Sequence, residues 1–286
     1  MPRVKVAILD TGLDVGHPSI QANVERIKDV KSWLSTNSAT TGNDPCGHGT
    51  HVTSLLLDVA PDCDVYIAQI SDDKSPLSAY HIAKAVDYAV RVWQVDIISM
   101  SFGFLDEKED GCDELRDALL RAHASKVLMF AAASNSGGED PAPAFPARVS
   151  NVFCIYSGDG KGNYSKTSAS AFSRDFNLLT LGEGVESAWP RHLSQYPWTK
   201  RKSGTSFATP IAAGFAAVLL LYACQNLPLE DAERFREYDR MKSWLLHLSN
   251  ERAGYNVLSL NDFVRRSPDE RRFLMTSILD GRPWKS

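Results

Sequence analysis

The stretch SGTSFATP, Ser203–Pro210, decides the fold, because it opens onto a long apolar run without a charged residue, Ile211–Cys224. A glycine and small hydroxyl residues before such a run predict a tight turn that leads into a buried helix. Ser206 then lies in the first helical turn, where unpaired N–H groups and the helix dipole stabilise an anion. Pro210 has no N–H to bond the carbonyl of Ser206, so this helix gives up a backbone bond beside one serine. The pattern points to a functional serine, although a serine or threonine cap in front of a core helix would also produce it.

The rest of the chain alternates between apolar, strand-like runs and segments with helical spacing. Strands are predicted at Val4–Leu9, Asp64–Ile70, Asp96–Gly103, Lys126–Ala133, Val152–Tyr156 and Leu178–Leu181, and helices at Val52–Val59, Leu77–Trp93 and Cys112–Ala124. This alternation predicts βαβ units, and hence an α/β fold with a doubly wound, mainly parallel sheet that has helices on both faces. After Leu227 the composition turns charged and amphipathic. We therefore expect one main domain, residues 1–227, and a C-terminal helical appendage, residues 228–286, packed on it.

Composition and charge exclude several classes of protein. At 286 residues with 43% hydrophobic side chains, the chain can bury a large core. A net charge of −4 without a basic block gives no basis for binding nucleic acid or a membrane surface, and the run Ile211–Cys224 is too short for a membrane span. Five widely spaced cysteines without a CxxC pair indicate reduced thiols in a cytosol rather than disulfides or a zinc site. The first strand begins directly after Arg3, so we expect neither a signal peptide nor an N-terminal pro-segment.

Three residues at the ends of predicted elements share one chemistry. Asp10 follows the first strand within DTG, His48 opens the motif HGTH, and Ser206 opens the apolar helix. A serine hydroxyl becomes a nucleophile when a neighbouring base removes its proton, and an imidazole does this near neutral pH. A carboxylate fixes the imidazole tautomer and stabilises the imidazolium. Each residue alone has an ordinary structural explanation, as a turn aspartate, a buried histidine or a helix cap, but the three together predict a catalytic triad.

These motifs resemble those of the subtilisin-like serine proteases, peptidase family S8, whose triad follows the same Asp, His, Ser order. The resemblance covers most of the chain and rests on residues 10–12, 48–51 and 204–210. It implies a serine endopeptidase that hydrolyses peptide bonds through an acyl-enzyme, with Asp10, His48 and Ser206 as the triad. His51 belongs to the motif as a buried, hydrogen-bonded neighbour and not as the base.

The same resemblance implies no cofactor and no metal. Many secreted relatives carry a calcium site on an insertion within the helix after the histidine motif. Here Leu55-Leu56-Leu57-Asp58 continues directly into Val59-Ala60-Pro61. We therefore expect the protein to fold and remain stable without calcium.

The resemblance also assigns the residues around the triad. Asn135 matches the side chain that stabilises the oxyanion together with the N–H of Ser206, although an asparagine in a glycine-rich turn is common without such a role. The expected substrate-binding residues are an edge strand that pairs with the substrate backbone and a pocket for the residue before the scissile bond. They are Ser101, Phe102 and Gly103 on the strand, Ala132, Ala133 and Ser134 on the pocket wall, and Ala144 near the floor. Ser134 stands where the family usually has glycine, and all these residues could also be small simply because helices pack close to the strand ends.

Two expectations follow for this pocket. Its assigned residues carry no charge, so it should prefer large apolar or aromatic side chains before the scissile bond. The bond between Phe145 and Pro146, beside the pocket, should be cis.

A further resemblance concerns the biological setting. The runs Ile97–Gly103 and Arg201–Ser206 and the C-terminal tail are similar to intracellular fungal subtilases, some of which accompany NLR-type immune receptors or act in heterokaryon incompatibility and programmed cell death. This implies a cytoplasmic, monomeric enzyme with a protein or peptide substrate, and a gasdermin-like pore-forming protein as its most specific partner. The alternative is a catalytically silent recognition or signalling module that retains the fold. Because Asp10, His48, Asn135 and Ser206 are all present, the sequence favours the active enzyme.

Overall fold

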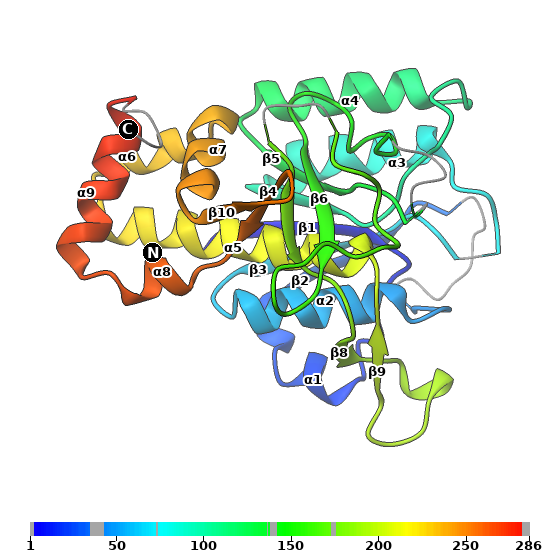
Figure 1. Ribbon diagram of the computed structural model, residues 1–286. Helices are drawn as coiled ribbons and strands as arrows, with labels where there is room; N and C mark the ends of the chain where they lie inside the picture. Colours follow the sequence, from blue (N-terminus) through cyan, green and yellow to red (C-terminus); the bar gives the residue numbers. More distant parts are fainter. Residues whose placement is uncertain are drawn as a thin grey trace.

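A nine-stranded sheet forms the centre of the molecule in the computed structural model, which describes residues 3–34, 43–72, 74–135, 137, 142–172 and 176–281 (Figure 1). The strand order is β10-β11-β7-β6-β5-β4-β1-β3-β2, and all neighbours are parallel except β10 and β11. The strands are β1 (Lys5–Asp10), β2 (Ile27–Ser32), β3 (Asp64–Gln69), β4 (Ile97–Met100), β5 (Leu128–Ala132), β6 (Phe153–Gly158), β7 (Leu178–Leu181), β10 (Ser249–Arg252) and β11 (Tyr255–Leu258). The predicted α/β fold with a mainly parallel sheet is confirmed.

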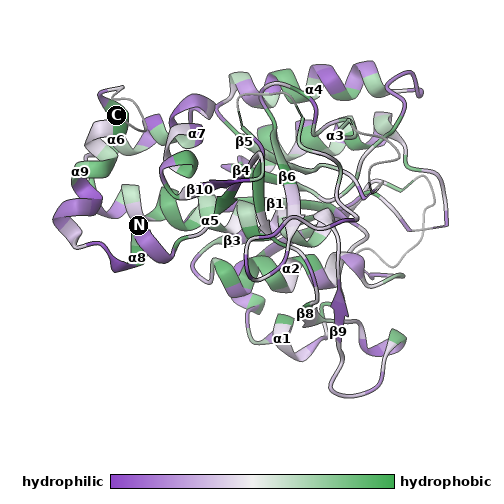
Figure 2. Ribbon diagram, viewed as in Figure 1, coloured by the Kyte–Doolittle hydropathy of each residue, from purple (hydrophilic) through white to green (hydrophobic). Residues whose placement is uncertain are grey.

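Helices cover both faces of this sheet because side chains alternate along each strand. In β1, Val6 and Ile8 belong to a core cluster shared with helices α2 and α5, whereas Ala7 and Leu9 belong to a second cluster shared with α3 and α4. The four helices are α2 (His48–Val59), α3 (Ala79–Tyr88), α4 (Cys112–Ala124) and α5 (Thr205–Asn226). In Figure 2 hydrophobic colouring dominates the central strands and α5, while hydrophilic colouring is frequent on the outer helices.

Helix α5 is long and apolar enough to cross a membrane, but 72% of its most apolar window is buried inside the protein. It contacts strands β4, β5, β6 and β7 as well as α2. The run that decides the fold is therefore a core helix.

The carboxyl ends of the central strands meet at one edge of the sheet. Leu9 of β1 pairs with Met100 of β4, and Met100 pairs with Ala131 of β5. The strand predicted to reach Gly103 ends at Met100 instead, because both neighbouring strands end at this level and leave the next residues without a ladder partner in the chain. Asp10, Ser101 and Ala132 therefore lie at the carboxyl ends of β1, β4 and β5, along the same edge of the sheet. Open α/β sheets place their functional groups at this edge.

The C-terminal region is helical, as predicted, but it also adds two strands that sequence reasoning missed. Its helices are α6 (Leu229–Glu233), α7 (Tyr238–His247), α8 (Asn261–Arg265) and α9 (Pro268–Leu279). The hairpin β10–β11 extends the main sheet through parallel pairing of β11 with β7. Trp244 is fully buried against Phe235, with ring centroids 4.4 Å apart, and Arg236 pairs with Asp96 at 2.9 Å. The division of the chain at residue 227 stays a prediction.

A second antiparallel hairpin lies outside the main sheet and precedes α5. It consists of β8 (Val185–Ala188) and β9 (Thr199–Lys202). The predicted helix at 77–93 forms as α3 followed by a π-helical turn, Ala89–Trp93. The shorter elements are α1 (Pro18–Gln21) and the 3-10 turns Val24–Arg26, Arg191–Leu193 and Arg234–Arg236. The Phe145–Pro146 bond is cis, as predicted, and so is Tyr196–Pro197.

Candidate active site

Ser206 is the second residue of α5, and it is tied to the end of β4. The carbonyl of Ser206, which Pro210 leaves without its helical donor, accepts a hydrogen bond from the Ser101 hydroxyl at 2.8 Å. In return, the Ser206 hydroxyl donates to the Ser101 carbonyl at 3.2 Å. This reciprocal pair fixes the start of the helix against the strand end, and it replaces the backbone bond that the proline removes.

Gly204 lets the chain enter this helix beside Asn135. Its φ is +145°, and a Cβ at this position would lie 3.0 Å from Asn135 Nδ2 and 3.1 Å from Oδ1. Asn135 Oδ1 accepts hydrogen bonds from the Thr205 N–H at 2.8 Å and from the Thr205 hydroxyl at 3.2 Å. Because an N–H must meet the amide oxygen, the orientation of the side chain is set and Nδ2 remains as a donor. Asn135 is exposed.

Asp10 and His48 form an ion pair beside the end of β1. His48 Nδ1 donates to Asp10 Oδ1 at 2.7 Å, and the same oxygen accepts the Thr11 N–H at 2.8 Å. The Asp10 side chain is 3% exposed and the His48 side chain 25%. With Nδ1 carrying the proton, a neutral His48 presents Nε2 as an acceptor. The ring of His48 lies 5.1 Å from that of Phe207, the residue after Ser206, so the first turn of α5 packs on the imidazole.

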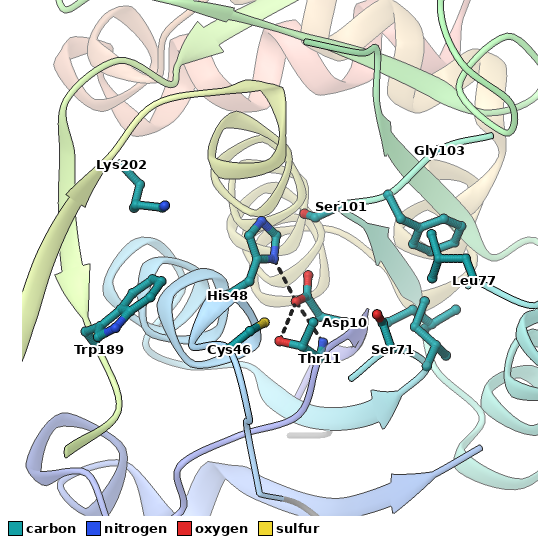
Figure 3. A pocket seen from close by; sticks show the side chains of 13 residues that line it. Asp10, Thr11, Cys46, His48, Ser71, Leu77, Ser101, Gly103, Trp189 and Lys202 are labelled. Atoms are coloured by element: carbon teal, nitrogen blue, oxygen red, sulfur yellow. Dashed lines mark hydrogen bonds and ion pairs between the residues drawn. The ribbon is translucent and has the colours of Figure 1, made fainter. Parts of the chain in front are cut away.

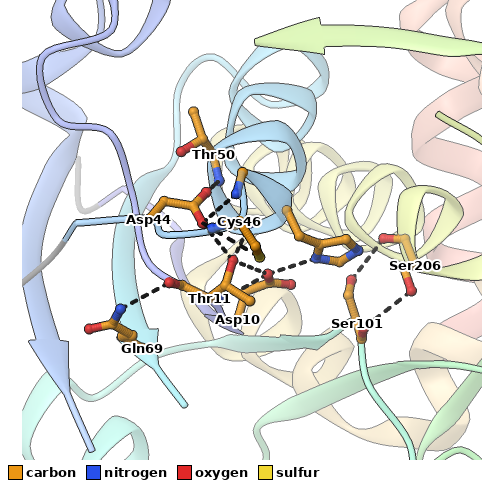
Figure 4. A network of polar contacts seen from close by, with 11 residues as sticks. Asp10, Thr11, Asp44, Cys46, Thr50, Gln69, Ser101 and Ser206 are labelled. Atoms are coloured by element: carbon orange, nitrogen blue, oxygen red, sulfur yellow. Dashed lines mark hydrogen bonds and ion pairs between the residues drawn. The ribbon is translucent and has the colours of Figure 1, made fainter. Parts of the chain in front are cut away.

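A second carboxylate, Asp44, lies behind this pair, and sequence reasoning missed it. Asp44 is completely buried and accepts the Thr11 hydroxyl at 2.8 Å, the Gly47 N–H at 2.8 Å and the Thr50 N–H at 2.7 Å. Figure 4 shows Asp44 and Thr50 on one side of Asp10, and Ser101 and Ser206 on the other. Asp44 therefore satisfies the N-terminus of α2, the helix that begins at His48. An aspartate four residues before a helix-opening histidine is a signal that could have revealed it.

The charges around His48 and its burial have opposite effects on its pKa. Burial of the imidazole lowers the pKa of His48, but the charge and hydrogen bond of Asp10 and the charge of Asp44 raise it, and Lys202 lowers it slightly. The net result is a pKa above the ordinary value for histidine. The imidazolium is thus favoured at this position.

A cavity of about 320 Å³ opens beside Asp10 and His48 (Figure 3). Ser101, Gly103 and Leu77 lie on one side of it, and Phe102 and Ile70 also line it. Ser101, Phe102 and Gly103 are the residues expected to pair with a substrate, and they follow β4 without belonging to an assigned strand. The next residue, Phe104, already bridges to Phe145, which limits the open segment to three residues.

The residues predicted for the pocket wall and floor do not line this cavity. Ala132, Ala133 and Ala144 are buried, and Ser134 is half-buried with φ of +152°. Ala144 N donates to the Ala133 carbonyl at 2.6 Å, and a Cβ on Gly103 would meet Ala144 Cβ at 2.6 Å. The structure thus brings Ala144 against Gly103. The assignment of these four residues to a substrate pocket stays a prediction.

His51 lies on the same helix as His48 but points into the core. It is fully buried between the rings of Phe207 and Trp189, and its Nε2 donates to the Lys200 carbonyl at 3.0 Å. Burial lowers the pKa of His51 to about 4, so the ring is neutral at physiological pH. In the described part of the chain no group of three or more histidine, cysteine, aspartate or glutamate side chains is arranged to hold a metal ion. None of the five cysteines forms a disulfide.

Comparison with known proteins assigns this fold to one class, the subtilisin-like serine endopeptidases. The model of the subtilase family, peptidase S8, matches residues 2–261. The chain belongs to the subtilase family, and it is a serine endopeptidase.

Relatives are found among fungal, bacterial and structurally characterised subtilases. The subtilisin-like protease het-Q2 of Podospora anserina is 28% identical over 82% of this chain and 73% of its own length. The major intracellular serine protease of Bacillus subtilis (strain 168) is 28% identical over 93% of this chain and 82% of its own. The protease domain of PatA superimposes with a TM-score of 0.75 at 26% identity, covering 97% of this chain and 96% of that domain.

Proposed function

We propose that Asp10, His48 and Ser206 form the catalytic triad of this endopeptidase. The observation that carries the proposal is the 2.7 Å bond from His48 Nδ1 to a buried Asp10, at the edge where α5 presents Ser206. His48 Nε2 takes the proton of Ser206 Oγ as the hydroxyl attacks the peptide carbonyl, and later gives it to the leaving amine. Water then hydrolyses the acyl-enzyme by the same proton transfers in reverse order. Since the Ser206 hydroxyl now bonds the Ser101 carbonyl, it must rotate toward His48 when a substrate binds.

Asn135 and the N–H of Ser206 stabilise the oxyanion in this proposal. The Thr205 N–H holds the amide oxygen of Asn135, so that Nδ2 can donate to the developing negative charge. The N–H of Ser206 belongs to the first turn of α5, where helical donors have no intrahelical partner. The substrate backbone pairs with Ser101–Gly103 as an added strand, and the neutral surroundings favour a large apolar side chain before the scissile bond.

The test is labelling with a fluorophosphonate probe together with proteolysis of an unfolded protein substrate. Ser206→Ala should abolish both while the circular dichroism spectrum is unchanged. Ser203→Ala is the matched control, because Ser203 is exposed three residues away and its hydroxyl oxygen accepts a bond from the Gly184 N–H. Robust proteolysis by purified Ser206→Ala would overturn the triad. Inactivity of the wild type towards every probe and substrate would favour the catalytically silent recognition module instead.

For the biological role, we propose limited cleavage of cytoplasmic partner proteins by a monomeric enzyme, with cell death or immune signalling as the outcome. Similarity to het-Q2 of Podospora anserina and to intracellular serine proteases supports this setting. The most specific candidate substrate is a gasdermin-like pore-forming protein, which would need only an exposed, flexible linker that can lie extended along Ser101–Gly103. Co-expression should yield one discrete cleavage and cell death with the wild type. Equal killing by Ser206→Ala would exclude this role.

A further inference from the structure

One side of the cavity has no part in the function proposed above. Trp189 and Lys202 line it, and they lie on the opposite side of His48 from Ser101 and Gly103 (Figure 3). If the acyl part of a substrate runs along Ser101–Gly103, the chain beyond the scissile bond continues past His48 towards this side, because His48 must reach the leaving amine. The residues there would contact the leaving-group part of the substrate.

Trp189 packs on the residue that precedes His48, and Lys202 contacts Trp189. Trp189 is 6% exposed and packs so tightly on Gly47 that a Cβ there would come within 2.6 Å of the indole. Lys202 Nζ lies 5.4 Å from the centroid of this ring and Lys200 Nζ 4.4 Å, as expected for residues on one face of β9. Lys202 is half-buried and lines the cavity, and its ammonium group is held there beside the fixed tryptophan.

The charged groups around Lys202 determine the charge that this side of the cavity presents. Its neighbour Arg201 points to the other face of the hairpin and pairs with Glu186 at 2.7 Å. Among the residues that the structure describes, Lys202 has no carboxylate within ion-pair distance. Asp10 and Asp44 are buried beneath the cavity and are held by hydrogen bonds from Thr11 and the start of α2. The cavity therefore presents a positive charge on this side.

We propose that Lys202 is a specificity-determining residue that selects substrates with aspartate or glutamate in the first positions after the scissile bond. This inference rests on the proposed triad, since only a substrate bound across His48 and Ser206 brings its leaving-group part to Lys202. A carboxylate there would meet an ammonium group that is partly desolvated by Trp189, whereas a lysine or arginine would meet a like charge. The expected preference is modest, about two- to tenfold, because the site is open to solvent.

The experiment uses internally quenched peptides that share the acyl-side sequence of a site cleaved by the wild type. Matched peptides carry Glu or Gln, and Asp or Asn, at the first or second position after the scissile bond, and all have amidated ends. The ratio of kcat/KM for acid over amide should be about two- to tenfold in the wild type, near one in Lys202→Met and inverted in Lys202→Glu. Lys200→Met is the matched control and should keep the wild-type ratio. The ratio should also shrink between about 50 mM and about 500 mM salt.

Three outcomes would overturn the proposal. They are equal rates for acid and amide peptides in the wild type, a preference that survives in Lys202→Met, and a preference that is lost equally in Lys200→Met. A further arm uses neutral peptides that end two residues after the scissile bond with a free or an amidated terminus. Selective cleavage of the free acid would mean that Lys202 reads the chain terminus rather than side chains. Failure of the triad itself would instead show as loss of all specific cleavage, equally for every peptide.

Discussion

The buried His51 should make the protein acid-sensitive in a defined pH range. Its pKa lies near 4 in the folded state, chiefly because the ring is buried, against about 6.5 in an unfolded chain. The sign follows from proton binding. Below pH 6.5 the unfolded chain binds a proton at this residue that the folded protein does not, so stability that is fully present above this pH is lost as the pH falls towards 4. Each pH unit in this window costs about 1.4 kcal/mol, which gives about 2 kcal/mol between pH 7.5 and pH 5.

The assay is urea unfolding, followed by tryptophan fluorescence, of Ser206→Ala protein to prevent self-digestion, with and without His51→Gln. Glutamine keeps an N–H that can reach the Lys200 carbonyl but does not titrate. At pH 7.5 the protein with both Ser206→Ala and His51→Gln should be less stable than Ser206→Ala alone. By pH 5 the difference in free energy of unfolding should have shifted by about 2 kcal/mol in favour of the double variant. The titratable groups that both proteins share contribute equally to the two stabilities, so their contributions cancel in this difference. Parallel stability curves from pH 7.5 to pH 5 would refute the reasoning.

The remaining predictions concern the site. Asn135→Ala should lower kcat by about 100- to 1,000-fold, the loss known for a single oxyanion donor in subtilisin, with KM little changed; an unchanged kcat would remove Asn135 from the mechanism. Asp44→Asn should lower the pKa of His48, whose net shift is upward, and so move the acidic limb of kcat/KM to lower pH, while Lys202→Met should move it to higher pH; shifts of the opposite sign would contradict the charge assignment. Ser101→Ala should destabilise the protein by about 1–3 kcal/mol, because the Ser206 carbonyl loses its donor, and less so in a Pro210→Ala background that restores a helical N–H; additive effects in this double-mutant cycle would disprove the pairing.

The elements that the sequence predicted well are those whose packing is regular. Helices α2, α3 and α4 have buried apolar residues at helical spacing, and α5, β1, β4 and β5 are continuous apolar runs, so these elements are predicted within a few residues. The hairpins were missed. Ser249–Arg252 and Thr199–Lys202 are short and polar, and they become strands because a neighbouring strand supplies hydrogen bonds, which a local pattern does not record.

The same distinction holds for the site. Asp10, His48 and Ser206 each stand beside a glycine because close backbone approach is needed: a Cβ on Gly49 would lie 2.1 Å from the Gly12 carbonyl. Such glycines leave a visible signature. Asp44 reaches the site from the loop before α2, where only its spacing from His48 marks it, and Trp189 and Lys202 come from the hairpin β8–β9, where no motif marks them. Their contribution comes from three-dimensional proximity, which one sequence does not reveal.

The proximity of Lys202 to His48 leads to a last prediction, which couples substrate choice to pH. Lys202 acts to lower the pKa of His48 through its positive charge, while Asp10 and Asp44 hold the net pKa above the ordinary value. A substrate carboxylate that pairs with Lys202 would offset that positive charge and bring a negative charge near the imidazole, so the pKa of His48 in the enzyme–substrate complex should rise further. Because kcat reports this complex, its acidic limb should lie at higher pH for a peptide with glutamate after the scissile bond than for the matched glutamine peptide. In Lys202→Met the acidic limbs for the two peptides should coincide, because the lysine that holds the substrate carboxylate near His48 is gone. Identical kcat profiles for the two peptides in the wild type, despite a clear preference in kcat/KM, would place the acidic side chain away from His48 and separate Lys202 from the chemistry.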